Sequence, residues 1–185
     1  MISRLPGSTL EADLGRSNAA DTLLSSIFLT GGLVLSQVSL LTGLEPYTIQ
    51  NWVKRGFLPP PVKKRYSRQH VCRLFIINML RDSMRIEKIC QLLTFVNGRL
   101  DDTGDDIIDD SVLYLYIVDL TARLGGQLPS AGQLHTWCAE LLTGYQEPYP
   151  GARGRVTAAL EIISTAYMAS MLRQRAELML SQLDG

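Results

Sequence analysis

The chain contains few of the residues on which secreted or membrane proteins depend. Only three of its 185 residues are cysteines, and their wide spacing argues against a disulfide framework and for a reducing, cytoplasmic setting. Its most apolar early stretch, residues 22–35, is broken by glycines and is too short to span a bilayer. No basic segment followed by an apolar run opens the chain, so we expect neither a signal peptide nor contact with a membrane.

Sequence patterns for catalysis and metal binding are also missing. We find no Ser/His/Asp, Cys/His or paired-carboxylate constellation and no phosphate-binding glycine loop, so we expect no enzyme and no cofactor. Residues 101–110 are rich in aspartate but lack the spacing of a calcium loop, which favours a solvated linker with Asp110 or Ser111 capping the next helix. His135 and Cys138 share one helical face and supply at most half of a metal site, so we expect no bound metal.

The net charge of zero conceals a division of charge along the chain. Residues 30–100 contain eleven Lys and Arg and three acidic residues, a balance of +8, whereas residues 101–185 contain five Arg and twelve acidic residues, a balance of −7. Such an asymmetry is typical of a chain in which one part meets a polyanion such as DNA. The alternative is that the two parts attract each other.

Glycine and proline clusters divide the chain into four segments. Residues 1–32 are expected to form a lead-in, flexible over 1–20 and followed by a short helix at 22–30 that Asp21 caps. Residues 33–96 contain several short helices, and residues 97–110, with two Gly and six Asp, form an acidic linker. Helices are expected at about 109–124, 132–143 and 153–183. The predicted fold class is all-α with a small β wing.

The last predicted helix is long and apolar on one broad face, so it needs a partner surface. The other two late helices, a second subunit, or both can supply that surface, and we interpret residues 111–185 as a helical dimerisation or effector domain of a homodimer. Aromatic residues of this domain either line a ligand pocket or belong to the core. They are Tyr114, Tyr116, Trp137, Tyr145 and Tyr149.

Seven positions agree with a helix-turn-helix that begins at Leu35. Apolar residues fall where two crossing helices must pack, and a small residue falls where the helices approach most closely. A glycine falls at the turn, and a proline falls in the first turn of the second helix. These residues are Val38, Ser39, Gly43, Leu44, Pro46, Ile49 and Trp52.

The second helix, residues 46–55, presents a polar face that suits the DNA major groove, although any solvated helix has such a face. The loop after it contains three prolines and then three consecutive cations, as expected of a wing (residues 59–66) that contacts phosphates. Ser67 is placed to cap the next helix. The predicted DNA-binding residues are Tyr47, Thr48, Gln50, Asn51, Lys54, Arg55, Lys63, Lys64, Arg65 and Tyr66.

Residues 35–93 resemble the DNA-binding domain of MerR-type regulators. Residues 48–59 (TIQNWVKRGFLP) match their recognition helix and turn, residues 65–67 (RYS) match their wing, and residues 84–93 resemble their next helix. With its acidic helical tail, the whole chain is similar to an uncharacterised bacterial family, domain-of-unknown-function family 1836.

The resemblance implies a winged helix-turn-helix protein that binds specific DNA sites as a dimer and regulates transcription. Gln50 and Val53 stand where MerR-type proteins usually carry an arginine and an acidic residue, and the tail is interrupted, so their DNA-distorting mechanism is not expected here. Two alternatives remain open. One is a protein-interaction or signalling adaptor that no longer binds DNA, and the other is a small-molecule sensor that uses the C-terminal helices.

Overall fold

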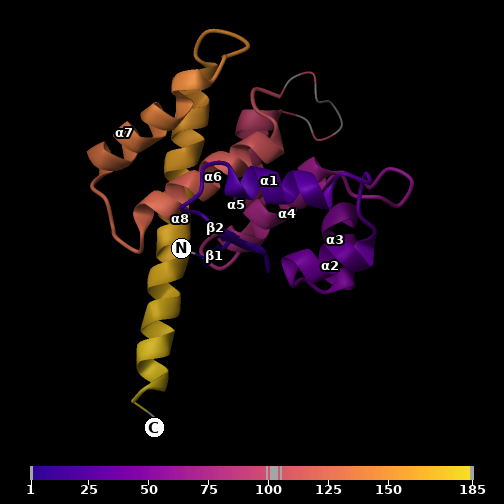
Figure 1. The fold of residues 1–185 in the computed structure, drawn as a ribbon, viewed down its shortest axis with the longest axis horizontal. Helices are drawn as coiled ribbons and strands as arrows, with labels where there is room; N and C mark the ends of the chain where they lie inside the picture. The colour runs from indigo at the N-terminus through magenta and orange to yellow at the C-terminus, as the bar shows by residue number, and fades with distance from the viewer. Residues whose placement is uncertain (1, 99, 101–103, 105, 184–185) are drawn as a thin grey trace.

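A computed structural model of the chain describes residues 2–98, 100, 104 and 106–183. It is mostly helical, which confirms the predicted class in its coarse form, and its one two-stranded sheet lies near the N-terminus and not at residues 59–66, where the β wing was predicted (Figure 1). The strands are β1 (Ile2–Arg4) and β2 (Glu11–Asp13), and the helices are α1 (Ala19–Ile27), α2 (Leu35–Thr42), α3 (Pro46–Lys54), α4 (Arg68–Leu80), α5 (Ile86–Asn97), α6 (Asp110–Leu124), α7 (Ala131–Leu141), the 3₁₀ turn η2 (Leu142–Gly144) and α8 (Ala152–Ser181).

Helix α4 lies at the centre of the hydrophobic core. Most of its side chains are buried, and it packs against α2, α5, α6 and α8. The rings of Phe75 in α4 and Tyr114 in α6 have centroids 5.2 Å apart. One cluster of buried residues therefore runs from Leu5 to Ala166. The segments 33–96 and 111–185, which we interpreted as separate domains, share this core.

The N-terminal residues are anchored to this core, so the prediction of a flexible segment over 1–20 is wrong. Strands β1 and β2 pair antiparallel, and Leu5 between them is fully buried. The Tyr114 hydroxyl donates to the Pro6 carbonyl at 2.7 Å. Gly7 has φ +68°, and a Cβ there would lie 2.0 Å from the Phe75 carbonyl oxygen, so the close approach requires glycine. The polar composition of residues 1–20 did not indicate this packing, because only a few apolar residues of the segment contact the core.

Helix α1 begins three residues earlier than predicted, after Asn18 rather than Asp21. Asp21 lies in the first turn, where it accepts a hydrogen bond from Arg68 of α4 at 2.5 Å. Its carboxylate therefore ties α1 to α4 instead of capping α1.

The two helices and the turn predicted from Leu35 onward are where we expected them. Gly43 ends α2 with φ 69°, and Pro46 is the first residue of α3. Val38 and Ile49 are fully buried between the helices. Ser39 packs at the crossing, where its hydroxyl donates to the Leu44 carbonyl at 2.6 Å.

Helix α8 has two halves with different surroundings. Its first half packs against α5, α6 and α7, with Val156, Leu160 and Ile163 fully buried. Its last turns extend beyond the rest of the molecule, as Figure 1 shows in yellow, and Leu178 and Met179 are 61% and 59% exposed. The bundle thus covers only part of the predicted apolar face. Among the described residues, no helix has the length and apolarity needed to cross a membrane.

Candidate nucleic-acid interface

Helix α3 presents the predicted polar face to solvent. Ile49 and Trp52 point into the core, with 0% and 7% of their surfaces exposed. On the other side Tyr47 is 78% exposed, Gln50 and Lys54 are exposed, and Thr48 and Asn51 are half-buried. No side-chain hydrogen bond to another described residue occupies these five groups, so they are available to a ligand.

Arg55 lies at the end of α3 and is partly occupied. Its guanidinium forms an ion pair with Glu87 of α5 at 2.8 Å and lies 4.4 Å from the centroid of the Phe57 ring. About half of the side chain is exposed, at 48%. These contacts hold the cation at the edge of the α3 surface and leave one side of it open.

Residues 62–65, which we call the basic turn, form a tight and ordered reversal of the chain. Val62 and Arg65 exchange two backbone hydrogen bonds of 3.1 and 2.9 Å. Lys63 and Lys64 between them have φ of 48° and 62°, the left-handed conformation that both central residues of a type I′ turn require. The backbone therefore projects both ammonium groups outward, and in Figure 1 the turn lies on the side of the molecule where α2 and α3 lie.

The base of the loop that carries the basic turn is joined to the residues before α2. Leu33 and Tyr66 form an antiparallel bridge with hydrogen bonds of 2.9 and 2.8 Å, and Arg65 donates to the Gly32 carbonyl at 2.8 Å. The loop predicted to be a β wing thus contains only isolated bridges, and its residues form no strand in the described part of the chain.

Tyr66 was predicted to contact DNA, and this prediction is wrong. Only 3% of its surface is exposed, its ring packs edge-on against His70, and burial raises the pKa of its hydroxyl. In an extended segment, successive side chains point to opposite sides, so an outward Arg65 requires an inward Tyr66. This alternation was readable from the sequence. The nine other predicted residues lie outside the core.

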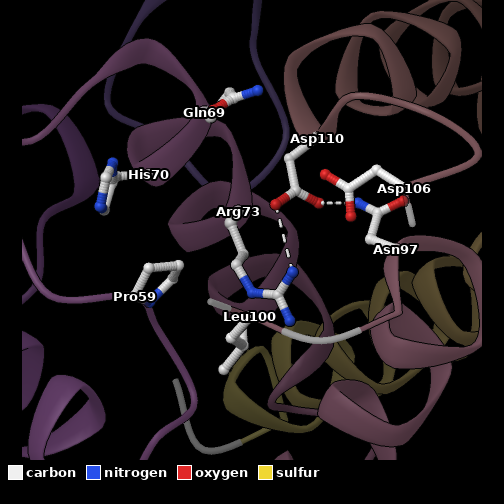
Figure 2. Close-up of a pocket in the computed structure, with 8 residues that line it drawn as sticks. All are labelled: Pro59, Gln69, His70, Arg73, Asn97, Leu100, Asp106 and Asp110. Carbon is white, nitrogen blue, oxygen red and sulfur yellow. Dashed lines mark hydrogen bonds and ion pairs between the residues drawn. The ribbon is translucent and has the colours of Figure 1, made fainter. Parts of the chain in front are cut away.

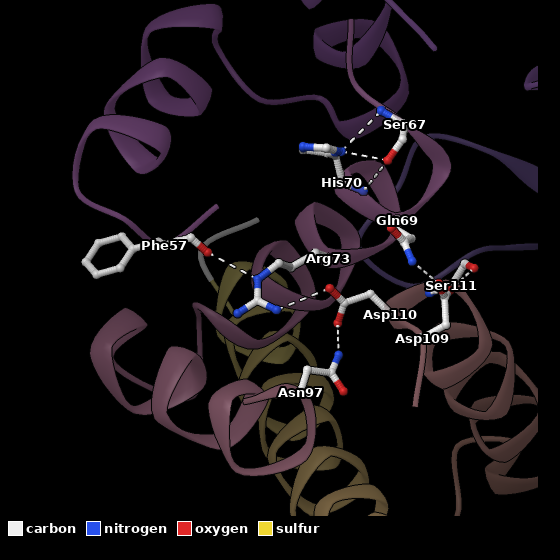
Figure 3. Close-up of polar contacts among 9 residues, drawn as sticks. All are labelled: Phe57, Ser67, Gln69, His70, Arg73, Asn97, Asp109, Asp110 and Ser111. Atoms are coloured by element: carbon white, nitrogen blue, oxygen red, sulfur yellow. Dashed lines mark hydrogen bonds and ion pairs between the residues drawn. The ribbon is translucent and has the colours of Figure 1, made fainter. Parts of the chain in front are cut away.

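A buried polar network that sequence reasoning missed lies behind this loop. Arg73 of α4, only 3% exposed, bonds Asp110 of α6 at 3.1 Å and donates from Nε to the Phe57 carbonyl at 3.3 Å (Figure 3). Asp110 also accepts from Asn97 of α5 at 2.7 Å. Burial raises the pKa of the Asp110 carboxyl, and the Arg73 guanidinium opposes that rise. The network therefore joins α4, α5, α6 and the chain that leaves α3.

Asp110 is thus paired and largely buried, with 12% of its side chain exposed, which contradicts its predicted place in a solvated linker. The cap of α6 is Asp109, whose carboxylate accepts from the Ser111 backbone N–H at 2.7 Å. Ile107 and Ile108 just before it are also buried. Residues 99, 101–103 and 105 of the predicted linker lie outside the described residues.

His70 joins the same loop to the start of α4. Ser67 caps α4 as predicted, and its backbone N–H donates to His70 Nδ1 at 3.2 Å. The proton of the imidazole therefore lies on Nε2, which contacts the Pro60 carbonyl at 3.3 Å. Burial lowers the pKa of His70, which favours this neutral form.

A small pocket opens beside the network (Figure 2). Its volume is about 110 Å³, and Pro59, His70, Arg73, Asn97 and Asp110 contribute to its walls. Pockets for small molecules usually measure roughly 300–1,000 Å³. We therefore interpret this space as part of the network that positions the loop, and not as a ligand site.

The candidate metal residues do not come together. His135 bonds Glu161 at 2.6 Å, while Cys138, three residues along α7, is fully buried. Burial raises the pKa of the Cys138 thiol to about 11. Within the described part of the chain, no group of three or more His, Cys, Asp or Glu side chains is placed to hold a metal ion.

The candidate interface lies within a segment of the chain that matches one protein-family model. Residues 33–116 match the model of a family described as a domain of unknown function (DUF1836). The matched segment runs from the bridge at Leu33 into α6, so it contains α3, the basic turn and all three side chains of the polar network. No curated protein and no solved structure matches the chain.

Proposed function

We propose that the protein binds specific DNA sites and regulates transcription, as a winged helix-turn-helix protein. Helices α2 and α3 form the helix-turn-helix, α3 enters the major groove, and residues 59–66 act as the wing on the phosphate backbone. The observation that carries this proposal is the juxtaposition of an unoccupied polar face on α3 with an ordered turn that projects two lysines. The major groove is about 12 Å wide and admits one helix.

The distribution of ion pairs favours DNA over a masked basic face. Among the described residues, Lys54, Lys63 and Lys64 form no ion pair, whereas Glu140, Glu161 and Glu177 of the later helices contact Arg or His side chains of those same helices. Glu140 pairs with Arg123 at 2.8 Å, and Asp110 is buried against Arg73. Within the part of the tail that the structure describes, no acidic side chain pairs with these three lysines, which favours a basic surface that is open to a polyanion.

Within α3, replacing Asn51 or Lys54 should have two different effects. An asparagine amide can bond an adenine edge bidentately, so Asn51→Ala should relax preference at one base position by about 1–3 kcal/mol. Lys54→Ala should instead weaken binding to all sequences alike, because a phosphate contact carries no sequence information. Competition binding with single-base variants of a selected site measures both. A uniform loss in the Asn51 variant would show that this side chain does not read a base.

The proposal includes a homodimer that pairs through the uncovered end of α8. Leu178, Met179 and Leu180 in this end and Leu183 just after it are 59–81% exposed, which is unusual for four apolar side chains so close in sequence. A second copy would bury them and present two α3 helices to the two halves of a palindromic site.

Replacing Leu178 and Met179 together by glutamate should therefore yield a monomer. DNA affinity should fall as well, because each monomer would hold only one half-site. Sedimentation equilibrium measures the mass, and Leu29→Glu, at an even more exposed leucine (81%) in another part of the chain, is the control. Equal masses for the wild type and the double variant would exclude this dimer interface.

A further inference from the structure

A second, larger cavity lies between the N-terminal hairpin, the end of α6, the α6–α7 loop and the middle of α8. Its volume is about 430 Å³, which falls in the range usual for small-molecule pockets. None of the five aromatic residues considered as pocket residues from the sequence lines it. Its walls are mainly apolar and include Leu14, Leu124, Leu128, Met168, Met171 and Leu172. We call this cavity the apolar groove.

The charged residues that line the apolar groove are both arginines, Arg4 and Arg175, and no acidic residue is among its lining residues. Arg175 differs from the other arginines of α8. Arg155 bonds the Tyr149 hydroxyl at 2.7 Å, Arg173 pairs with Asp82 at 3.2 Å, and Arg153 bonds backbone carbonyls. Arg175 has no polar partner among the described residues. A cation without a counter-ion beside an apolar wall favours a ligand that carries an anionic head and an apolar body.

Two further groups of the groove are suited to a carboxylate. Arg4 uses Nε to donate to the Ser8 carbonyl at 2.7 Å, which leaves the outer nitrogens of its guanidinium open. The Tyr167 hydroxyl has no hydrogen-bond partner among the described residues, and burial raises the pKa of this group, so it keeps its proton and can donate. A cationic amphiphile would meet two like charges and no acceptor carboxylate in the same groove.

We propose that the apolar groove binds an amphipathic carboxylic acid, of the medium-chain fatty acid class, with its tail against the leucines and its carboxylate on Arg175. This site shares no residue with α3 or the basic turn. The inference does not depend on DNA binding, and its test contains no DNA.

Three probes with the same tail and different heads test this assignment on the full-length protein. Isothermal titration with decanoate, decanol and decyltrimethylammonium should give saturable one-to-one binding of decanoate per chain. Decanol should bind at least tenfold more weakly, and the cation should show no saturable binding. Equal binding of all three probes, or binding of none, would overturn the proposal.

Variants in α8 and in the α6–α7 loop show where the head and the tail of the ligand bind. Arg175→Gln should weaken decanoate at least tenfold and leave decanol unchanged, whereas Arg173→Gln, whose side chain pairs with Asp82, is the matched control and should bind as the wild type does. Leu128→Ser should weaken both probes. The proposal is wrong if the wild type does not bind decanoate and is a dimer that the Leu128→Ser variant dissociates. That result would show that a second copy of the chain occupies the groove.

Discussion

Asp110→Ala is expected to lower the free energy of unfolding by about 3–5 kcal/mol, the usual cost of removing one partner from a buried ion pair. Arg73 would keep its charge in a site where only 3% of its side chain is exposed, and the Asn97 amide would lose its acceptor. The Arg73 guanidinium would then be buried without a counter-ion and the Asn97 amide without this acceptor, which costs more than the lost attraction. Urea denaturation of wild type and variant, followed by circular dichroism, measures the difference.

Two control variants distinguish this explanation from a general effect of removing charge. The double change Arg73→Met and Asp110→Leu should recover most of the loss, because apolar residues of similar volume leave no buried charge unpaired. Glu140→Ala removes an ion pair of comparable length, 2.8 Å, that lies at the surface, and should cost about 0–1 kcal/mol. A loss below about 1 kcal/mol for Asp110→Ala would mean that the pair is solvated and the network does not hold the loop.

Replacing Lys63, Lys64 and Arg65 together by alanine is expected to reduce DNA affinity on the order of a hundredfold at low salt. Each lost phosphate contact also lowers the slope of log affinity against log salt by about one, so the slope should fall by about three. The sequence preference of the variant should remain, because α3 is unchanged. Fluorescence anisotropy over a series of salt concentrations measures both quantities.

The left-handed backbone of the basic turn supplies a control that separates charge from shape. Lys63→Asn with Lys64→Gly removes two charges and introduces the pair of residues that a type I′ turn prefers. This variant should therefore be at least as stable as the wild type and still lose about two from the salt slope. Unchanged DNA binding in this variant would exclude the basic turn from the interface.

Local patterns predicted much of the helical framework. Gly43 and Pro46 mark the turn between α2 and α3, and Ser67 marks the start of α4, because each of these residues acts on backbone groups within a few positions. The outward face of α3 followed from the inward positions of Ile49 and Trp52. Each of these features depends on residues that are close in the sequence, so the spacing of residue types is enough to predict it.

Features that rest on contacts between distant residues were not predicted. Arg73 looked like one cation among many in a basic segment, and Asp110 looked like one carboxylate in an acidic linker. Their pairing needs α4 and α6 to pack side by side, which no local pattern indicates. The N-terminal hairpin is a similar case. The need for a buried Leu5 and for a glycine at position 7 arises only because the hairpin covers a surface of α4 and α6.

Selection of bound sequences from a random DNA pool by the full-length protein tests the central claim most directly. The proposed function predicts enrichment of one short sequence in two inverted copies whose centres lie roughly 10–10.5 base pairs or a multiple of that apart, with recovery that falls as salt rises. A pool that stays random after repeated selection, with no salt-dependent retention of DNA by the protein, would contradict it.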